Sequence, residues 1–401
     1  MPLDFTSTPN AAPVPCMPSE TQYYPSSHGI LEYHGHQYLS GTRSYNSINM
    51  KLVRTFLILA CNLTGACSTL GYYAQSVAGQ TDVMQRQVSI NDIIADPESD
   101  PRLKQKLTAT LGILDYARIE LDLPDNGSYR KYADIQRKYI VWNIFAAPEL
   151  SLQPKMWCYL VIGCTSYRGY FNKDQALTEA RKLAAAGWDV SVNGVIAYST
   201  LGWFRDPVLN TMLLLDNWET ARLLFHELAH QRIYFRDDTD FNEAFADAVA
   251  HIGLQGWLQE QTAEVRQSAL TVIKREDQFF DLVLAARDRL AELYQSGLSD
   301  QAMRAEKLRL IKQLQTDYRG LKAGWDGYNR YDDWIVNNIN NASLSALATY
   351  RSLISDFLAA YQFHGSNLAR FYEWIEMLSD CTKPERLLLL RHPAQRPSCA
   401  D

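Results

Sequence analysis

The sequence lacks an excess of positive charge: its 401 residues include 39 lysines and arginines against 45 aspartates and glutamates, a formal net charge of -6. Without a broad basic surface, we expect no nucleic acid among its partners. From residue 67 onward it also lacks internal repeats and low-complexity tracts, which argues against a repeat architecture. A Cys-x-x-Cys zinc ribbon is absent as well. With 47% hydrophobic residues, the chain can bury a large globular core.

The first 49 residues lack lysine and any periodic apolar run, and they hold six of the fifteen prolines. Such a segment cannot bury enough apolar surface to fold. We therefore expect residues 1–49 to be a disordered or non-native upstream stretch, and Met50 to be the real start of the protein.

A secretory signal follows Met50. Lys51 and Arg54 precede a nearly continuous apolar run at 55–63, which is the order of a signal peptide. The run is too short to span a membrane as a stable helix. We expect residues 50–66 to be a signal peptide.

The end of this signal, two small residues followed by Cys67, resembles the lipobox of bacterial lipoproteins, in which the cysteine is lipidated. One position departs from it, because Thr64 stands where Leu, Val or Ile is usual. Ordinary signal cleavage and a true membrane anchor are the alternatives. Ser68, rather than Asp, resembles lipoproteins sorted to the outer membrane of cells with two membranes. We therefore expect a lipid-anchored protein of the cell envelope that faces the periplasm.

Four cysteines remain beyond Cys67, and an even number in an exported chain indicates disulfides. The first two lie in "WCYLVIGC", close enough to bridge across a tight turn. Buried free thiols are the alternative. The disulfide candidates are Cys158, Cys164, Cys381 and Cys399.

Apolar spacing divides the remaining chain into three regions. Residues 72–118 have helical periodicity, 139–171 is strand-like, 173–186 is helical, and Asn193 and Gly194 suggest a turn between two short strands. After residue 262 the pattern is almost entirely helical. The expected regions are an N-terminal helical segment (67–138), an α+β core (139–262) and a helical lobe (263–401).

The segment "FHELAH" carries the clearest chemical signal. Asp216 and Glu219 predict a capped helix start, and residues four apart on a helix share a face, so His226 and His230 direct their imidazoles to one spot. Glu227 lies beside that spot. Two imidazoles can hold a zinc ion while the carboxylate takes a proton from zinc-bound water.

A catalytic zinc ion needs a third protein ligand and one open position. A second helix begins at "DFNEAFADAVA", and Glu243 in its first turn, thirteen residues after His230, is the expected ligand. The alternative is that Glu243 caps the helix together with Asp240. We expect His251, further along the same helix, to be a partly buried histidine without a ligand role.

The two motifs together resemble the thermolysin-like gluzincins, whose second helix has the pattern Asn-Glu-x-x-x-Asp. Here Asn242, Glu243 and Asp247 match that pattern. The resemblance implies that one zinc ion is bound by His226, His230 and Glu243. It also implies that Asp247 accepts a hydrogen bond from the far nitrogen of a ligand histidine, with Asn242 beside it.

A second resemblance covers nearly the whole chain from Met50. The segments "LGYYAQ", "LPDNGSYRKYAD", "VWNIFAAPELSLQP", "WCYLVIGCTSYRGYF", "AYSTLGWFRDP", "HELAH" and "FNEAFA" are similar to a bacterial family of predicted aminopeptidase lipoproteins. This resemblance implies a metallopeptidase that acts on peptides. The expected fold is α+β: a zincin-like (gluzincin) core with a small mixed sheet and a C-terminal helical lobe.

Two further roles have candidates rather than assignments. A donor to the tetrahedral oxyanion is expected beside the metal, and we favour Tyr198 over Tyr328 and Tyr331 because it lies just before the metal-binding helix. Glu149 is a candidate anchor for a substrate ammonium group. The competing function is a lipid-anchored envelope binding or scaffold protein whose zinc site is structural or vestigial.

Overall fold

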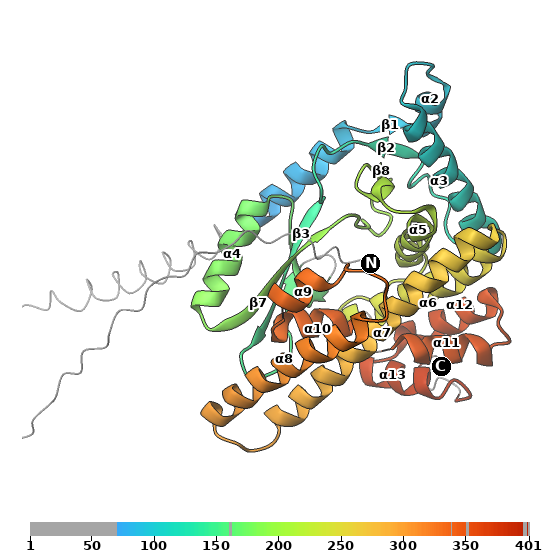
Figure 1. Cartoon of the computed structure of the whole chain (residues 1–401). Coiled ribbons are helices and arrows are strands. Elements are labelled where there is room, and N and C mark those ends of the chain that lie inside the picture. The colour runs from blue at the N-terminus through green and yellow to red at the C-terminus, as the bar shows by residue number, and fades with distance from the viewer. Residues whose placement is uncertain (1–69, 160–162, 338, 350–352, 396–398, 400–401) are drawn as a thin grey trace, which may run out of the picture. The chain divides into compact units, whose positions relative to one another are not determined.

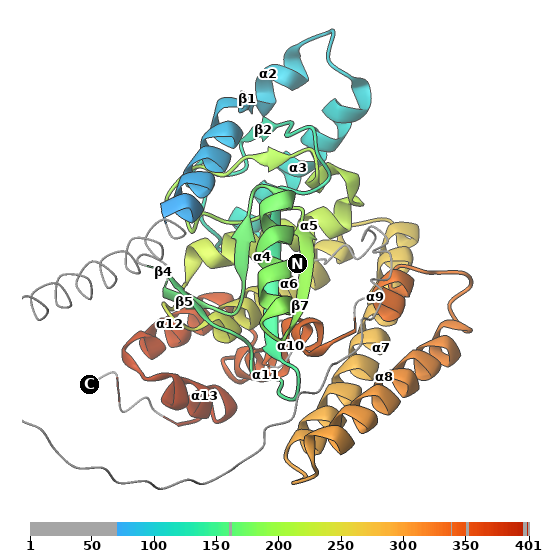
Figure 2. The same ribbon diagram turned by 90° about the vertical axis from the view of Figure 1, so that its left-hand side faces the viewer.

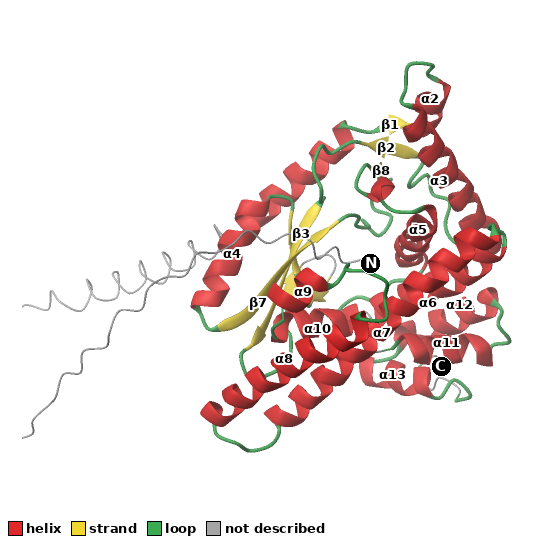
Figure 3. Cartoon of the chain, viewed as in Figure 1, coloured by secondary structure: helices red, strands yellow, loops and turns green. Residues whose placement is uncertain are grey.

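The computed structural model describes residues 70–159, 163–337, 339–349, 353–395 and 399 (Figure 1). The expected signal peptide at 50–66, the lipidation site Cys67 and Ser68 lie outside the described residues. The described residues from Gln75 onward belong to one compact unit. In the described part of the chain, no helix is both long and apolar enough to cross a membrane. The fold is mixed α+β and mainly helical, which confirms the expected fold class at that level (Figure 3).

The helical periodicity predicted over 72–118 is confirmed for most of this region, but the short strand β1 and the loops around it interrupt the helices. Residues 75–85 are helical, and then come β1 (Val88–Ser89), α2 (Ile90–Ala95) and α3 (Pro101–Glu120). Asp100 caps α3 by accepting the backbone N–H groups of Arg102 and Leu103. Pro101 suits the first turn because that position needs no N–H. This cap restarts the helix.

A three-stranded antiparallel sheet lies at the centre of the fold, in the order β6-β3-β7. Its strands are β3 (Val141–Pro148), β6 (Arg168–Tyr170) and β7 (Trp188–Val195). Helix α4 (Lys173–Ala185) lies against one face and α10 (Asn341–Thr349) against the other (Figures 1 and 2). Phe145 packs with Ala342 and Ala346 on the α10 side. The predicted helix at 173–186 is thus confirmed.

The turn predicted at Asn193 and Gly194 is wrong, because both residues lie inside β7. Asn193 pairs with Asn143, and Gly194 pairs with Trp142. A Cβ at Gly194 would lie 2.4 Å from the Tyr139 ring. The glycine therefore permits a close side-chain approach within a strand instead of forming a hairpin turn.

A second small sheet connects distant parts of the sequence. Strand β2 (Lys131–Ala133) pairs antiparallel with β1 and parallel with β8 (Val208–Leu209). Because β2 and β8 run side by side, the residues just before each strand are neighbours.

A hairpin of β4 (Trp157–Tyr159) and β5 (Gly163–Thr165) carries the Cys158–Cys164 disulfide. The N–H of Cys164 donates to the carboxylate of Asp237 at 2.6 Å. A second disulfide joins Cys381 to Cys399 near the C-terminus. All four disulfide candidates are therefore paired in the structure.

The rest of the described chain is helical. A short 3-10 turn, Met212–Leu214, leads into the helix pair α5 (Asn217–Arg232) and α6 (Thr239–Gln259). The helices that follow are α7 (Ala263–Tyr294), α8 (Asp300–Lys322), α9 (Asp332–Asn337), α11 (Ile354–Phe363), α12 (Leu368–Met377) and α13 (Lys383–Arg391). Figure 2 shows α7 and α8 side by side. They share an apolar core with α9, whereas α11 and α12 pack on the core around α6.

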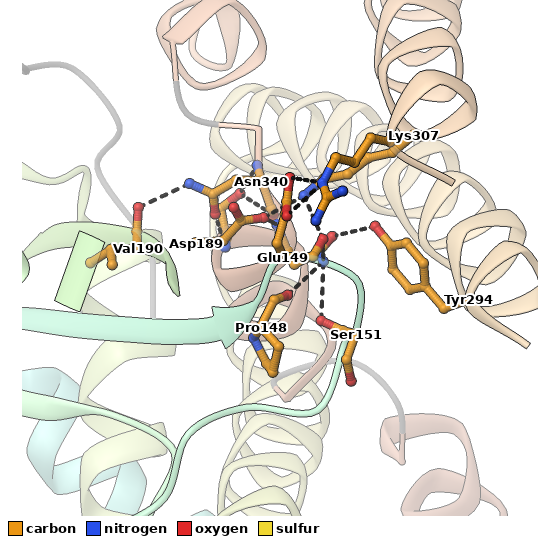
Figure 4. A network of polar contacts seen from close by, with 11 residues as sticks. Pro148, Glu149, Ser151, Asp189, Val190, Tyr294, Lys307 and Asn340 are labelled. Carbon is orange, nitrogen blue, oxygen red and sulfur yellow. Dashed lines mark hydrogen bonds and ion pairs between the residues drawn. The ribbon is translucent and has the colours of Figure 1, made fainter. Parts of the chain in front are cut away.

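A buried polar network attaches α8 and α10 to the end of the central sheet (Figure 4). The Asn341 amide nitrogen lies 2.8–3.1 Å from the carbonyl oxygens of Pro148, Glu149 and Ser151. Lys307 binds the Asp189 carboxylate at 2.6 Å and the Glu149 carbonyl at 2.8 Å.

Glu149, the candidate ammonium anchor, belongs to this network. Its carboxylate accepts the Arg304 guanidinium at 2.9–3.0 Å. The residue thus helps to attach α8 to the sheet, and its charge is already paired.

Replacing Asn341 by alanine is expected to lower the free energy of unfolding by about 3 kcal/mol, because buried carbonyl oxygens lose their donor. Urea unfolding followed by circular dichroism measures this loss. Asn337→Ala is the matched control, since that amide is exposed and contacts Asp333 in its own helix; we expect its effect to stay within about 0.5 kcal/mol. Equal losses for the two variants would contradict a docking role for the network.

Candidate metal centre

Helix α5 runs through the protein interior. It begins with the predicted capping box, in which the Glu219 carboxylate accepts the N–H of Asp216 at 3.2 Å. From Trp218 to His230 every residue except Arg222 is buried. Polar side chains at such positions are costly unless they are paired or bind a ligand, so the polar residues of this helix require an explanation.

The connection from α5 to α6 is fixed by side-chain contacts. The Asn242 amide accepts the Phe235 N–H at 2.8 Å and donates to the Phe235 carbonyl at 2.6 Å. Arg386 of α13 binds the Asp238 carboxylate at 2.6 Å. Asn242, predicted to lie beside the metal ligands, therefore acts on the connecting segment, and it holds α6 alongside α5.

Three expected ligands meet between the two helices. The Nε2 atoms of His226 and His230 are 3.1 Å apart, and one Glu243 carboxylate oxygen lies 3.3 Å from the first and 3.6 Å from the second. Tetrahedral ligands at about 2.0–2.1 Å from a zinc ion lie about 3.3–3.4 Å from one another. The spacing of the three atoms fits that geometry.

The chemistry of the donors also fits a cation. Two imidazole nitrogens that face each other at 3.1 Å repel through their lone pairs unless a proton or a metal ion lies between them. The nearby Glu243 oxygen is buried and makes no other hydrogen bond to the described residues. His226, His230 and Glu243 are the group of metal-ligand residues that meets within the described part of the chain.

The electrostatics of the site favour positive charge. Burial alone lowers the pKa of His226, but the carboxylates of Asp247 and Glu243 outweigh it and raise this pKa to about 9. Burial raises the pKa of Glu243, but the two imidazoles outweigh it and bring this pKa down to about 2. The buried carboxylate is therefore ionised at neutral pH.

Asp247 orients one of the ligands. Its carboxylate oxygen lies 2.8 Å from Nδ1 of His226. A proton on Nδ1 donates to Asp247, which leaves the lone pair of Nε2 directed at the site.

Asp247→Asn is expected to weaken zinc binding by about 10- to 100-fold, because a neutral amide replaces the anionic acceptor that fixes the tautomer of His226 and raises the basicity of its ring. Competition with a chromogenic chelator measures the affinity. Asp277→Asn, on helix α7 and outside the site, is the control and should leave the affinity unchanged. If Asp247→Asn binds zinc with the affinity of the wild type, Asp247 does not orient His226 for metal binding.

Glu227 lies on α5 next to the ligand histidines but is not one of the three converging groups. It is fully buried, and neither carboxylate oxygen has a hydrogen-bond partner among the described residues. Burial raises its pKa, while the neighbouring histidines act in the opposite direction. A buried, unpartnered carboxylate beside a cation site can accept a proton.

The three tyrosines proposed as oxyanion donors have different surroundings. The Tyr198 hydroxyl donates to the side chain of Gln80. Tyr331 stacks on Phe279 with ring centroids 3.9 Å apart in the core of the helical lobe. The Tyr328 ring lies under the Arg275 guanidinium.

His251, for which we expect no ligand role, contacts Gln255, its neighbour on α6, at 2.8 Å. His251 is not part of the group of converging ligand residues found in the described chain.

Sequence reasoning missed two buried residues near Glu227. Tyr129 and Asp206 are 1% and 3% exposed. Burial is the main cause that raises the pKa of each side chain, and the negative charge of Glu227 raises both pKa values further. Each lies in a segment quoted above for its family resemblance, "LPDNGSYRKYAD" and "AYSTLGWFRDP". Because the segments are far apart in sequence, only the pairing of β2 with β8 reveals that they are neighbours.

Fold and site together define a class: an α+β protein in which two histidines and one glutamate from adjacent helices form a group that could hold a metal ion, beside a buried glutamate that has no hydrogen-bond partner among the described residues. A family model described as "Putative aminopeptidase" matches residues 71–390. The chain belongs to this family, which suggests peptidase activity. Comparisons with curated proteins and with solved structures found no match.

Proposed function

We propose that the protein is a zinc-dependent aminopeptidase anchored in the bacterial cell envelope. One zinc ion is bound by His226, His230 and Glu243, and Glu227 is the general base. The observation that carries the proposal is the convergence of three ligand atoms within 3.1–3.6 Å beside the buried, unpartnered carboxylate of Glu227. The family membership supports a peptide substrate.

The metal ligands, Glu227 and Asp247 have different roles in the proposed hydrolysis. A zinc ion held by His226, His230 and Glu243 would supply Lewis acidity for polarising a carbonyl and for making a water molecule more acidic. Glu227 accepts the proton of the attacking water and then donates it to the leaving amine. Asp247 keeps the Nε2 lone pair of His226 directed at the site.

The finer fold assignment is part of the same proposal. The helix pair α5 and α6, with its ligands at His226, His230 and Glu243, supports a zincin-like core of the gluzincin type. The lipobox-like sequence before Cys67 supports attachment through a lipid, and Ser68 supports the outer membrane as the place of attachment. Tyr198 serves as the oxyanion donor only if its hydroxyl leaves Gln80 when substrate binds.

The test is a peptide panel with metal analysis. We expect the purified protein to hold one zinc ion and to release N-terminal residues from unblocked peptides. Chelation should abolish this activity, and added zinc should restore it. A protein that retains zinc but hydrolyses no peptide of the panel would instead support the envelope binding protein with a structural zinc site.

A further inference from the structure

Tyr129 and Asp206 each lie just before a strand of the small sheet. Tyr129 lies two residues before β2 and Asp206 two residues before β8, and these strands run parallel as neighbours. The backbone N–H of Tyr129 donates to the carbonyl of Asp206 at 2.5 Å. The two side chains are thereby fixed in one region of the fold.

The same region lies along the Glu227 side of α5. Gln231 is one turn beyond Glu227 on that helix, so the two share a face. The Gln231 side chain accepts the amide of Asn126 at 2.8 Å, which attaches the segment before Tyr129 to this face.

The groups gathered there have unused hydrogen-bonding capacity. Oδ2 of Asp206 accepts the N–H and the hydroxyl of Thr200 at 2.9 and 3.0 Å. Its Oδ1 is buried and has no partner in the described residues. The Tyr129 hydroxyl is also buried, and it makes no hydrogen bond of ordinary geometry within the described chain, although the Ser199 side chain lies near it. Buried acceptors without donors are rare in native proteins and indicate an absent partner.

The backbone of Tyr129 gives an independent sign. Its φ of 59° lies in the left-handed region, where a bulky side chain is strained. Such strain persists only where the surrounding structure imposes it, and it is concentrated at functional sites.

We propose that Asp206 and Tyr129 form the subsite that binds the protonated N-terminal amine of the substrate. An ammonium group offers three donors and one positive charge, and Asp206 supplies a buried, partnerless anionic oxygen. Burial raises the pKa of Asp206 to about 7, and a bound ammonium opposes that cost by favouring the ionised carboxylate. This inference rests on the proposed function and identifies its substrates as peptides with a free N-terminus.

Covalent geometry then explains why cleavage occurs after the first residue. The amine nitrogen and the carbonyl carbon of one residue are separated by two bonds, about 2.5 Å. An amine held at Asp206 therefore brings the first peptide bond, rather than a later one, into the neighbourhood of Glu227. The charge of Glu227 acts on Asp206 and helps to raise its pKa, with burial as the main cause, and the contact of Asn126 with Gln231 holds the segment before Tyr129 on the Glu227 face of α5.

A purely structural role for Asp206 is the competing explanation, because its Oδ2 fixes Thr200 in the loop before β8. Asp206→Asn separates the two roles. Asparagine keeps an acceptor for Thr200 but removes the charge that an ammonium requires. Thr200→Val does the opposite, since it removes the hydroxyl contacts with Asp206 and with the backbone of Phe204 and keeps the charge.

The kinetic test compares a free and an N-acetylated aminoacyl substrate. Asp206→Asn is expected to lower kcat/KM for the free-amine substrate by about 10²- to 10³-fold, the loss typical of a buried charge partner. The bound zinc should stay at one per chain. Asp189→Asn, at the buried network of α8, controls for loss of an aspartate charge elsewhere. If Thr200→Val loses as much as Asp206→Asn, the loop contact explains the effect and the proposal is overturned.

A binding test avoids dependence on catalysis. Calorimetry with zinc-free Glu227→Gln protein should detect leucinamide binding at least about tenfold tighter than binding of N-acetylleucinamide. Adding Asp206→Asn should remove the difference, and Tyr129→Phe should reduce it. Equal binding of the two amides would overturn the amine subsite, even if the wild-type enzyme hydrolyses peptides. Conversely, preferential leucinamide binding without any hydrolysis would preserve the subsite and refute the peptidase.

Discussion

Glu227→Gln is expected to lower kcat for peptide hydrolysis by about 10³-fold while one zinc ion remains bound. Glutamine preserves the shape of the side chain but cannot accept the proton, and a positioned general base contributes about 10²- to 10⁴-fold. KM should change little, because the proton moves only in the transition state. Steady-state kinetics together with metal analysis of the same sample measure both quantities.

Stability provides the control for Glu227→Gln. The native carboxylate is fully buried without a hydrogen-bond partner in the described residues, so replacing it with a neutral amide should not lower the melting temperature. Glu227→Asp keeps the charge but withdraws it by about one methylene group, and we expect intermediate activity. Full activity of Glu227→Gln with zinc bound would exclude Glu227 as the base.

The candidate metal ligands could be predicted from the sequence because they depend on local geometry. His226 and His230 are four residues apart, and any α-helix places such residues on one face. The helix itself was predictable from its capping residues, Asp216 and Glu219. Glu243 needed one further step, a short connection that lets α6 return beside α5. That step succeeded because a polar turn limits where the next helix can pack.

Tyr129 and Asp206 could not be predicted in this way. Their proximity depends on the parallel pairing of β2 with β8, strands of three and two residues. Such short strands leave almost no periodic signal in a sequence. Tyr129 also adopts a left-handed backbone conformation that sequence propensity assigns to glycine or asparagine. The proximity of Tyr129 and Asp206 was therefore not predictable from the sequence, because it depends on long-range strand pairing and on a strained backbone.

The errors in the predicted fold have a related cause. Asn-Gly is a strong hairpin signal when only local preferences act, but Gly194 lies against the Tyr139 ring within a ladder paired to β3. Tertiary packing overrode the local preference there. In the N-terminal region, Asp100 and Pro101 are a clear local signal for the start of α3, but the helical spacing of 72–118 gave no sign of the two-residue strand β1 before it.

Replacing Glu243 by glutamine is expected to weaken zinc binding by about 10²- to 10³-fold and to remove peptidase activity at ordinary zinc concentrations. A structural zinc site of four ligands has an apparent binding free energy of about 10–16 kcal/mol, so each ligand contributes about 3 kcal/mol, or a little over 10²-fold. Loss of the only anionic ligand should exceed this average. Chelator competition measures the affinity, and excess zinc should restore part of the activity.

Glu260→Gln is the matched control for Glu243→Gln, because it makes the same chemical change at an exposed carboxylate just beyond the end of α6. Its zinc affinity should equal that of the wild type.

In the wild type the zinc affinity should also rise about tenfold per pH unit between pH 7 and about 9, and then level off. Below that pH the zinc-free His226, whose pKa is raised to about 9 by Asp247 and Glu243 against the effect of burial, holds a proton that zinc must displace. An affinity that does not change with pH, or that survives in Glu243→Gln, would place the metal ion elsewhere.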